Sequence, residues 1–162
     1  MNHIANNLEQ RPYSAAVIKT LARSPALFIN NQWVESQGGA TLAVEDPSNK
    51  KEVSRIVDAS DADVDRAVAA ARAAFDDGRW SDLPAAAREL IINRLADLIE
   101  QNADEFAELE AIDSGKPKTM AAAVDIPGAI NHLRYMAGWA TKLGGELINP
   151  GTAPDGAFHS FV

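Results

Sequence analysis

The chain has 162 residues, of which 46% are hydrophobic and 23% charged, and its net charge is −8 at pH 7. These values predict about one globular domain, and no apolar run reaches the roughly 20 residues needed to cross a bilayer. The negative charge, without any basic cluster, argues against nucleic acid as a partner. Cysteine is absent, which excludes disulfides, thiolate metal ligands and thiol nucleophiles within this chain.

The first 25 residues lack a positively charged start followed by an uninterrupted apolar core, so no secretory signal is expected and the predicted location is cytoplasmic. Residues 15–21 are amphipathic and predict a surface helix or a mobile arm rather than a transit peptide. Residues 1–26 are therefore interpreted as an N-terminal arm.

Four short stretches predict β-strands, namely residues 27–29, 32–34, 41–45 and 53–58. Asn30 and Asn31 join the first two, because Asn tolerates the positive φ that a two-residue hairpin turn requires. Asp46 to Asn49 are turn residues that separate the last two strands. A β element this small needs other parts of the chain to stabilise it.

Apolar residues then recur at helical spacing and predict four helices. These run from 61 to a break at 77–78, from 85 to about 101, from 103 to a break at 114–117, and from there to 144–145. Ser60 and Asp63 predict a capping pair for the first of these helices. Asp82 is a candidate N-cap for the second, with Pro84 in its first turn. Pro127 should bend the last helix or reset its start.

The apolar residues of these helices form stripes. The first helix carries Val64, Ala67, Val68, Ala71 and Phe75, and the second carries Ala87, Ile91, Leu95, Leu98 and Ile99. Apolar helix faces are unstable in water without a partner, so some other part of the protein must cover them.

A further strand is predicted at residues 158–162. Such a strand needs an edge to pair with, and no residue after Val162 supplies one. We therefore expect this chain to be part of a longer protein or a natural truncation.

No catalytic constellation is evident: the three histidines are far apart, and there is neither a nucleophile elbow nor a phosphate-binding Gly-rich loop. His132 is predicted to be a partly buried structural residue. Asp113 lies in the last turn of its helix, where the dipole disfavours negative charge, so a partner is expected. Two alternatives stay open, a nearby Lys, Arg or backbone N–H group, and a bound alkali cation.

Four blocks in this order resemble the N-terminus of an aldehyde dehydrogenase, namely residues 28–36, 46–76, 109–117 and 133–148. The resemblance covers about residues 27–162. It implies an α/β fold for the whole family domain and an α+β fold for this chain, a small β element followed by a helical block. Residues 27–150 would then be the N-terminal part of the cofactor-binding domain, and residues 151–162 the start of a strand that pairs between subunits of a dimer or tetramer.

The resemblance also implies NAD(P)-dependent oxidation of aldehydes to carboxylic acids through a cysteine thiolate and a glutamate-activated water. In the family these groups, and those that bind NAD or NADP, lie downstream of Val162, so neither catalytic nor cofactor-binding residues are expected here and this chain alone should be inactive. Residues 131–135 and 157–161 are similar to phenylacetaldehyde dehydrogenases, which suggests an aromatic aldehyde as substrate.

Family positions that line the substrate tunnel match Val124 and Gly128. Two alternatives stay open: Val124 could be only a core residue, and Gly128 could only relieve the bend at Pro127. A monovalent cation site in some members matches the backbone carbonyls of Val44 and Glu45 together with Asp113. The alternative function is a stand-alone, non-catalytic helical module, or a pseudoenzyme, that associates with full-length relatives.

Overall fold

The structure is a computed structural model that describes residues 12–145, 147–148 and 160–161. Its helices are α2 (Ala15–Leu21), α3 (Asp61–Asp76), α4 (Ala85–Gln101), α5 (Ala103–Ser114), α6 (Lys118–Met120), the π-helical turn η1 (Ala121–Asp125) and α7 (Ile126–Trp139). Its strands are β1 (Leu27–Ile29), β2 (Gln32–Val34), β3 (Thr41–Asp46), β4 (Lys51–Val57), β5 (Leu147–Ile148) and β6 (Ser160–Phe161). They pair as three separate antiparallel hairpins, β1–β2, β3–β4 and β5–β6. This arrangement confirms the α+β class.

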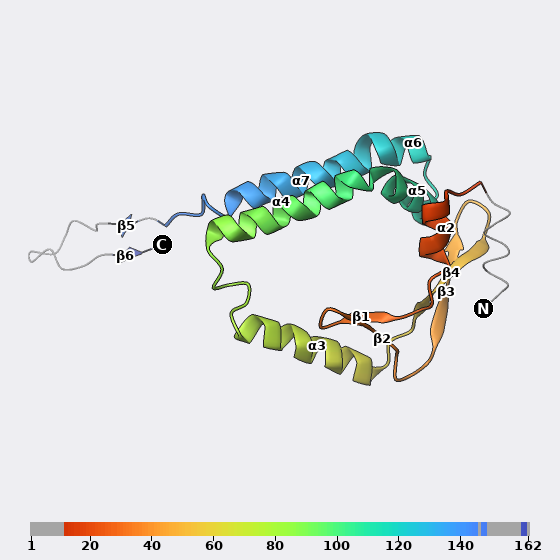
Figure 1. The fold of residues 1–162 in the computed structure, drawn as a ribbon, viewed down its shortest axis with the longest axis horizontal. Coiled ribbons are helices and arrows are strands. Elements are labelled where there is room, and N and C mark those ends of the chain that lie inside the picture. Colours follow the sequence, from red (N-terminus) through yellow and green to blue (C-terminus); the bar gives the residue numbers. More distant parts are fainter. Residues whose placement is uncertain (1–11, 146, 149–159, 162) are drawn as a thin grey trace, which may run out of the picture.

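The elements form an open frame (Figure 1). Helices α4 and α7 pack against each other along one side. Helix α3 and the β1–β2 hairpin lie along the opposite side, and α2, α5 and the β3–β4 hairpin join the two sides at one end. None of the helices in the described residues combines the length and apolarity that crossing a bilayer requires.

Two small hydrophobic clusters hold this frame. The first consists of Ala96, Ala107, Ala121, Ile126 and Ile130, where α4, α5, η1 and α7 meet. The second consists of Val17, Val53 and Ile112, where α2, β4 and α5 meet. The first is built largely from alanine and the second has only three members, so each buries little apolar area.

The residues outside these clusters leave much apolar surface in water. On α3, Val64, Val68 and Phe75 are 51%, 61% and 70% exposed. On α4, Leu90, Ile91, Leu95 and Leu98 are also exposed. The described part of this chain therefore leaves most of the predicted stripes uncovered, although Ala87 and Ile99 of α4 are half-buried and Ile99 packs against the first cluster.

Several local sequence signals are confirmed. Asn30 and Asn31 adopt φ of 50° and 61°, as the predicted hairpin turn requires. Ser60 and Asp63 form the expected capping box of α3. Pro127 lies in the first turn of α7, where the π-helical turn gives way to α-helix, so this proline resets the helix start.

Other predictions are wrong in detail. The N-cap of α4 is Pro84, which makes no side-chain capping bond, and Asp82 does not take that role. Helix α7 ends at Trp139, before the glycines expected to stop it. The predicted C-terminal strand is seen only as β6, and β5 supplies its pairing edge, so the edge comes from earlier in the chain. Residues 149–159 and 162 lie outside the described residues.

Helix α2 is a docked helix and not a mobile arm. Val17 is fully buried against Val53 and Ile112. The Ser14 backbone N–H donates to Glu108 Oε1 at 2.7 Å, and the Thr20 hydroxyl donates to Glu105 Oε1 at 2.7 Å. These contacts fix residues 14–21 on α5.

Candidate functional site

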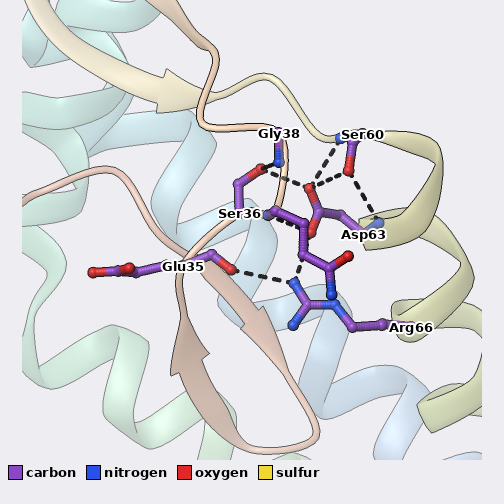
Figure 2. A network of polar contacts seen from close by, with 7 residues as sticks. Glu35, Ser36, Gly38, Ser60, Asp63 and Arg66 are labelled. Carbon is purple, nitrogen blue, oxygen red and sulfur yellow. Dashed lines mark hydrogen bonds and ion pairs between the residues drawn. The ribbon is translucent and has the colours of Figure 1, made fainter.

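The most completely bonded polar group in the frame is the Asp63 carboxylate, at the N-terminus of α3 (Figure 2). Its side chain is fully buried. Ser36 Oγ donates to Asp63 Oδ2 at 2.6 Å, and the Gln37 backbone N–H donates to Oδ1 at 3.1 Å. The Ser60 backbone N–H donates to Oδ2 at 3.0 Å, and Arg66 Nη2 lies 2.6 Å from Oδ1. The carboxylate thus joins the segment after β2 to the first turn of α3.

These donors hold the pKa of Asp63 far below its ordinary value. The hydrogen bond from Ser36 is the largest cause, followed by the Gln37 N–H group, and together they outweigh the opposing effect of burial. Arg66 also donates to the Glu35 carbonyl oxygen at 3.2 Å, which ties the same segment a second time. A carboxylate with so low a pKa cannot transfer protons near neutral pH. We interpret Asp63 as a fixed structural anion that positions α3.

The residues of the predicted cation site lie where β3 approaches the end of α5. The β3–β4 register shifts between Val44 and Glu45, and such a bulge interrupts the ladder and leaves backbone groups unpaired. Val44 packs on the cluster that contains Ile112, the neighbour of Asp113. The structure therefore brings both predicted segments to one corner.

Asp113 itself is exposed, and within the described residues its side chain forms no hydrogen bond or ion pair. The described residues therefore supply neither a Lys or Arg side chain nor a backbone N–H group as its partner. No group of three or more His, Asp or Glu side chains in the described residues is placed to hold a metal ion. One carboxylate with two backbone carbonyls is a different donor set, made only of the oxygen ligands that hard cations prefer.

Gly115 is the C-cap of α5 and lies against the turn between β3 and β4. Its φ of +74° is left-handed, and a Cβ atom there would lie 2.9 Å from Pro47 Cγ. Helix α5 can therefore end against the β3–β4 turn only with glycine at this position.

Asp46, in the same turn, is a buried carboxylate that the sequence reasoning did not single out. Burial acts to raise its pKa, but hydrogen bonds from Ser48, Tyr13 and Asn49 outweigh burial and leave the pKa below its ordinary value. The turn sequence Asp-Pro-Ser-Asn was the available signal, because an Asp side chain that accepts from the residue two positions on makes an Asx turn.

The two predicted tunnel residues share one exposed helix face. Val124, in η1, is 55% exposed, and Gly128 begins the next turn, in α7, with nothing within 4 Å of the position a Cβ would occupy. A spacing of four residues places them one above the other. Val124 is therefore not a core residue of the described chain, and π-helical turns inside helices often mark functional sites.

An ion-paired lysine sits beside this π-helical turn. Lys116 Nζ lies 2.8 Å from both Glu110 and Asp125, so it links the end of α5 to η1. Its pKa is raised, first by the hydrogen bond to Asp125 and then by that to Glu110.

His132, which was expected to be partly buried, is exposed on α7.

Comparison with known proteins identifies the fold. Residues 33–160 match the aldehyde dehydrogenase family. An aldehyde dehydrogenase of Emericella nidulans is 48% identical over 128 residues, which cover 78% of this chain and 25% of that protein. The mitochondrial benzaldehyde dehydrogenase of Antirrhinum majus is 45% identical over 122 residues, 75% of this chain and 23% of that protein.

The NAD⁺ complex of the Bacillus cereus aldehyde dehydrogenase has the same fold over 84% of this chain and 28% of that one, with a TM-score of 0.80 at 38% identity. The chain therefore belongs to the aldehyde dehydrogenase family. It spans about a quarter of the length of the curated relatives it matches.

Replacing Asp63 by Asn tests whether the Asp63 carboxylate is a fixed structural anion that positions α3. Asn keeps the shape but removes the charge that Arg66 and the hydroxyl and N–H donors bind, so the urea midpoint at pH 7 should fall. Because the folded-state pKa of Asp63 is depressed, its stabilisation is complete above the ordinary aspartate pKa of about 4 and is lost as pH falls further.

Urea denaturation at a series of pH values should therefore show a weaker acid dependence for Asp63→Asn than for the unchanged chain. Asp61→Asn is the matched control, since Asp61 is an exposed residue of the same first turn. Equal midpoints and equal acid dependence for the two variants would contradict the assignment.

Proposed function

We propose that this chain forms the N-terminal part of an NAD(P)-dependent aldehyde dehydrogenase that oxidises aldehydes to carboxylic acids. The observation that carries the proposal is the shared fold with the NAD⁺-bound Bacillus cereus enzyme, at a TM-score of 0.80 and 38% identity. The family match over residues 33–160 supports it independently.

In this proposal the chain supplies framework and not chemistry. It contains no cysteine, so the thiolate that attacks the aldehyde comes from the rest of the enzyme. The fixed Asp63 carboxylate holds α3 in place, and the docked α2 holds α5. The exposed apolar faces of α3 and α4 then pack on the cofactor-binding sheet. The alternative of a stand-alone module is less consistent with so much uncovered apolar surface.

We propose an aromatic aldehyde, of the phenylacetaldehyde class, as substrate. Support comes from the exposed face that Val124 and Gly128 share, where the missing side chain at Gly128 leaves room beside Val124. The benzaldehyde dehydrogenase among the relatives is consistent with an aromatic substrate. The active enzyme is expected to be a dimer or tetramer, to use NAD or NADP, and to bind no nucleic acid.

Gly128→Met tests both the activity and the tunnel wall, in an enzyme that carries this segment together with the rest of the family domain. A long side chain at Gly128 should lower kcat/KM for phenylacetaldehyde about tenfold relative to acetaldehyde, since filling a pocket by a few methylenes has an effect of that order. NADH formation followed by absorbance measures both rates.

Ala129→Met is the matched control, because Ala129 is exposed but lies about 100° further round the helix. Equal selectivity in the two variants would remove Gly128 from the tunnel. NADH or NADPH formation by the 162-residue chain alone, or neither by the enzyme that contains it, would contradict the proposed function itself.

We further propose that Asp113 and the carbonyls of Val44 and Glu45 bind a monovalent cation. The interrupted β3–β4 ladder and the unpaired Asp113 carboxylate support this. Sodium-23 NMR of an enzyme that carries this segment together with the rest of the family domain should show line broadening that Asp113→Asn abolishes. Asp58→Asn removes the same charge from an exposed position elsewhere, and an equal loss of broadening in that control would indicate only general charge attraction.

A further inference from the structure

A groove of about 550 Å³ lies outside the proposed tunnel and cation site. It is formed by Thr20 of α2, by residues 23–26, which link α2 to β1, by Trp33 of β2, and by residues 54–57 of β4. Its volume falls within the range of about 300–1,000 Å³ that small-molecule sites occupy. The groove is therefore large enough for a ligand of two fused rings.

The charge of this groove opposes that of the whole chain. Arg23 and Arg55 line it, and none of its described lining residues is acidic, although the chain carries a net charge of −8. Within the described residues, the Arg23 guanidinium has no hydrogen-bond or ion-pair partner. One arginine is thus available to an incoming anion.

Arg55 is held in a fixed position. Its Nε donates to Thr41 Oγ1 at 3.0 Å, and its Nη1 lies 3.0 Å from Glu52 Oε1. Glu52 offsets the charge of Arg55, so Arg23 is the arginine of the groove that has no carboxylate partner among the described residues. This balance suits an anion with a single negative charge better than a phosphate, which carries nearly two.

The rest of the lining favours an aromatic ring. Trp33 is 66% exposed and its ring is tilted by 58° against Phe28, with 5.1 Å between the ring centroids. Phe28 thus supports the indole from one side, and Pro25 and Ile56 add apolar walls to the groove. A planar ring can pack on the indole while a carboxylate on that ring pairs with the guanidinium groups.

We propose that this groove binds a planar aromatic monocarboxylate, with Arg23 as the principal charge partner and Trp33 as the packing surface. The site is independent of the proposed dehydrogenase activity, because it uses neither the tunnel residues nor the cation corner.

Isothermal titration calorimetry with 2-naphthoate, on an enzyme that carries this segment together with the rest of the family domain, tests the proposal. Saturable binding tighter than about 1 mM is expected, with affinity for the neutral isostere 2-naphthamide about tenfold weaker, the ratio expected when one charged hydrogen bond is lost. Arg23→Gln should weaken 2-naphthoate about tenfold, and Trp33→Leu should weaken both compounds. Neither side chain is buried, so both variants should fold.

Arg72→Gln is the matched control, since Arg72 also lies beside an exposed aromatic ring, 5.4 Å from the Phe75 centroid, but outside the groove. The proposal is overturned if 2-naphthoate gives no saturable heat, or if Arg23→Gln and Arg72→Gln bind it equally. Tighter binding of adenosine monophosphate than of 2-naphthoate would overturn the choice of a carboxylate.

Discussion

The apolar faces of α3 and α4 remain in contact with water because the described part of the chain has too little else to place over them. Burying one large apolar side chain contributes about 1.5–3 kcal/mol, and a whole domain is stable by only about 5–15 kcal/mol. Val64, Val68 and Phe75 on α3, with their counterparts on α4, therefore represent a free energy comparable to the stability of a complete domain. The free energy of unfolding of this chain therefore depends on the surface that covers the apolar faces of α3 and α4.

Polar contacts give the frame its shape although they bury little apolar area. Asp63 fixes the N-terminus of α3 to the segment that follows β2. Glu108 accepts from the Ser14 N–H group and pairs with Lys118 at 2.9 Å, which joins α2, α5 and α6. Burial acts to raise the pKa of Glu108, yet these partners leave it below its ordinary value, as expected for a carboxylate that stays charged. Such directional contacts can set the positions of helices before their apolar faces are covered.

Local signals predicted the elements well because the interactions that create them are local. The Asn30-Asn31 turn and the Ser60–Asp63 capping box each depend on a few neighbouring residues, and each is confirmed. Prediction was incomplete where a distant contact decides the outcome, as for α2, whose helix was expected but whose docking onto β4 and α5 through Val17 was not. The Ser36–Asp63 hydrogen bond spans 27 residues, and no local pattern encodes it. The position of Asp113 in the last turn of its helix singled it out from the sequence alone, whereas the tunnel residues and the Val44 and Glu45 carbonyls came only from the family resemblance.

Size-exclusion chromatography of the 162-residue chain, with a fluorescent dye that binds exposed apolar surface, measures most directly whether α3 and α4 are built to be covered by another part of an enzyme. We predict self-association, strong dye binding and weakly cooperative unfolding. A monomer that binds no dye and unfolds in one cooperative transition would contradict this.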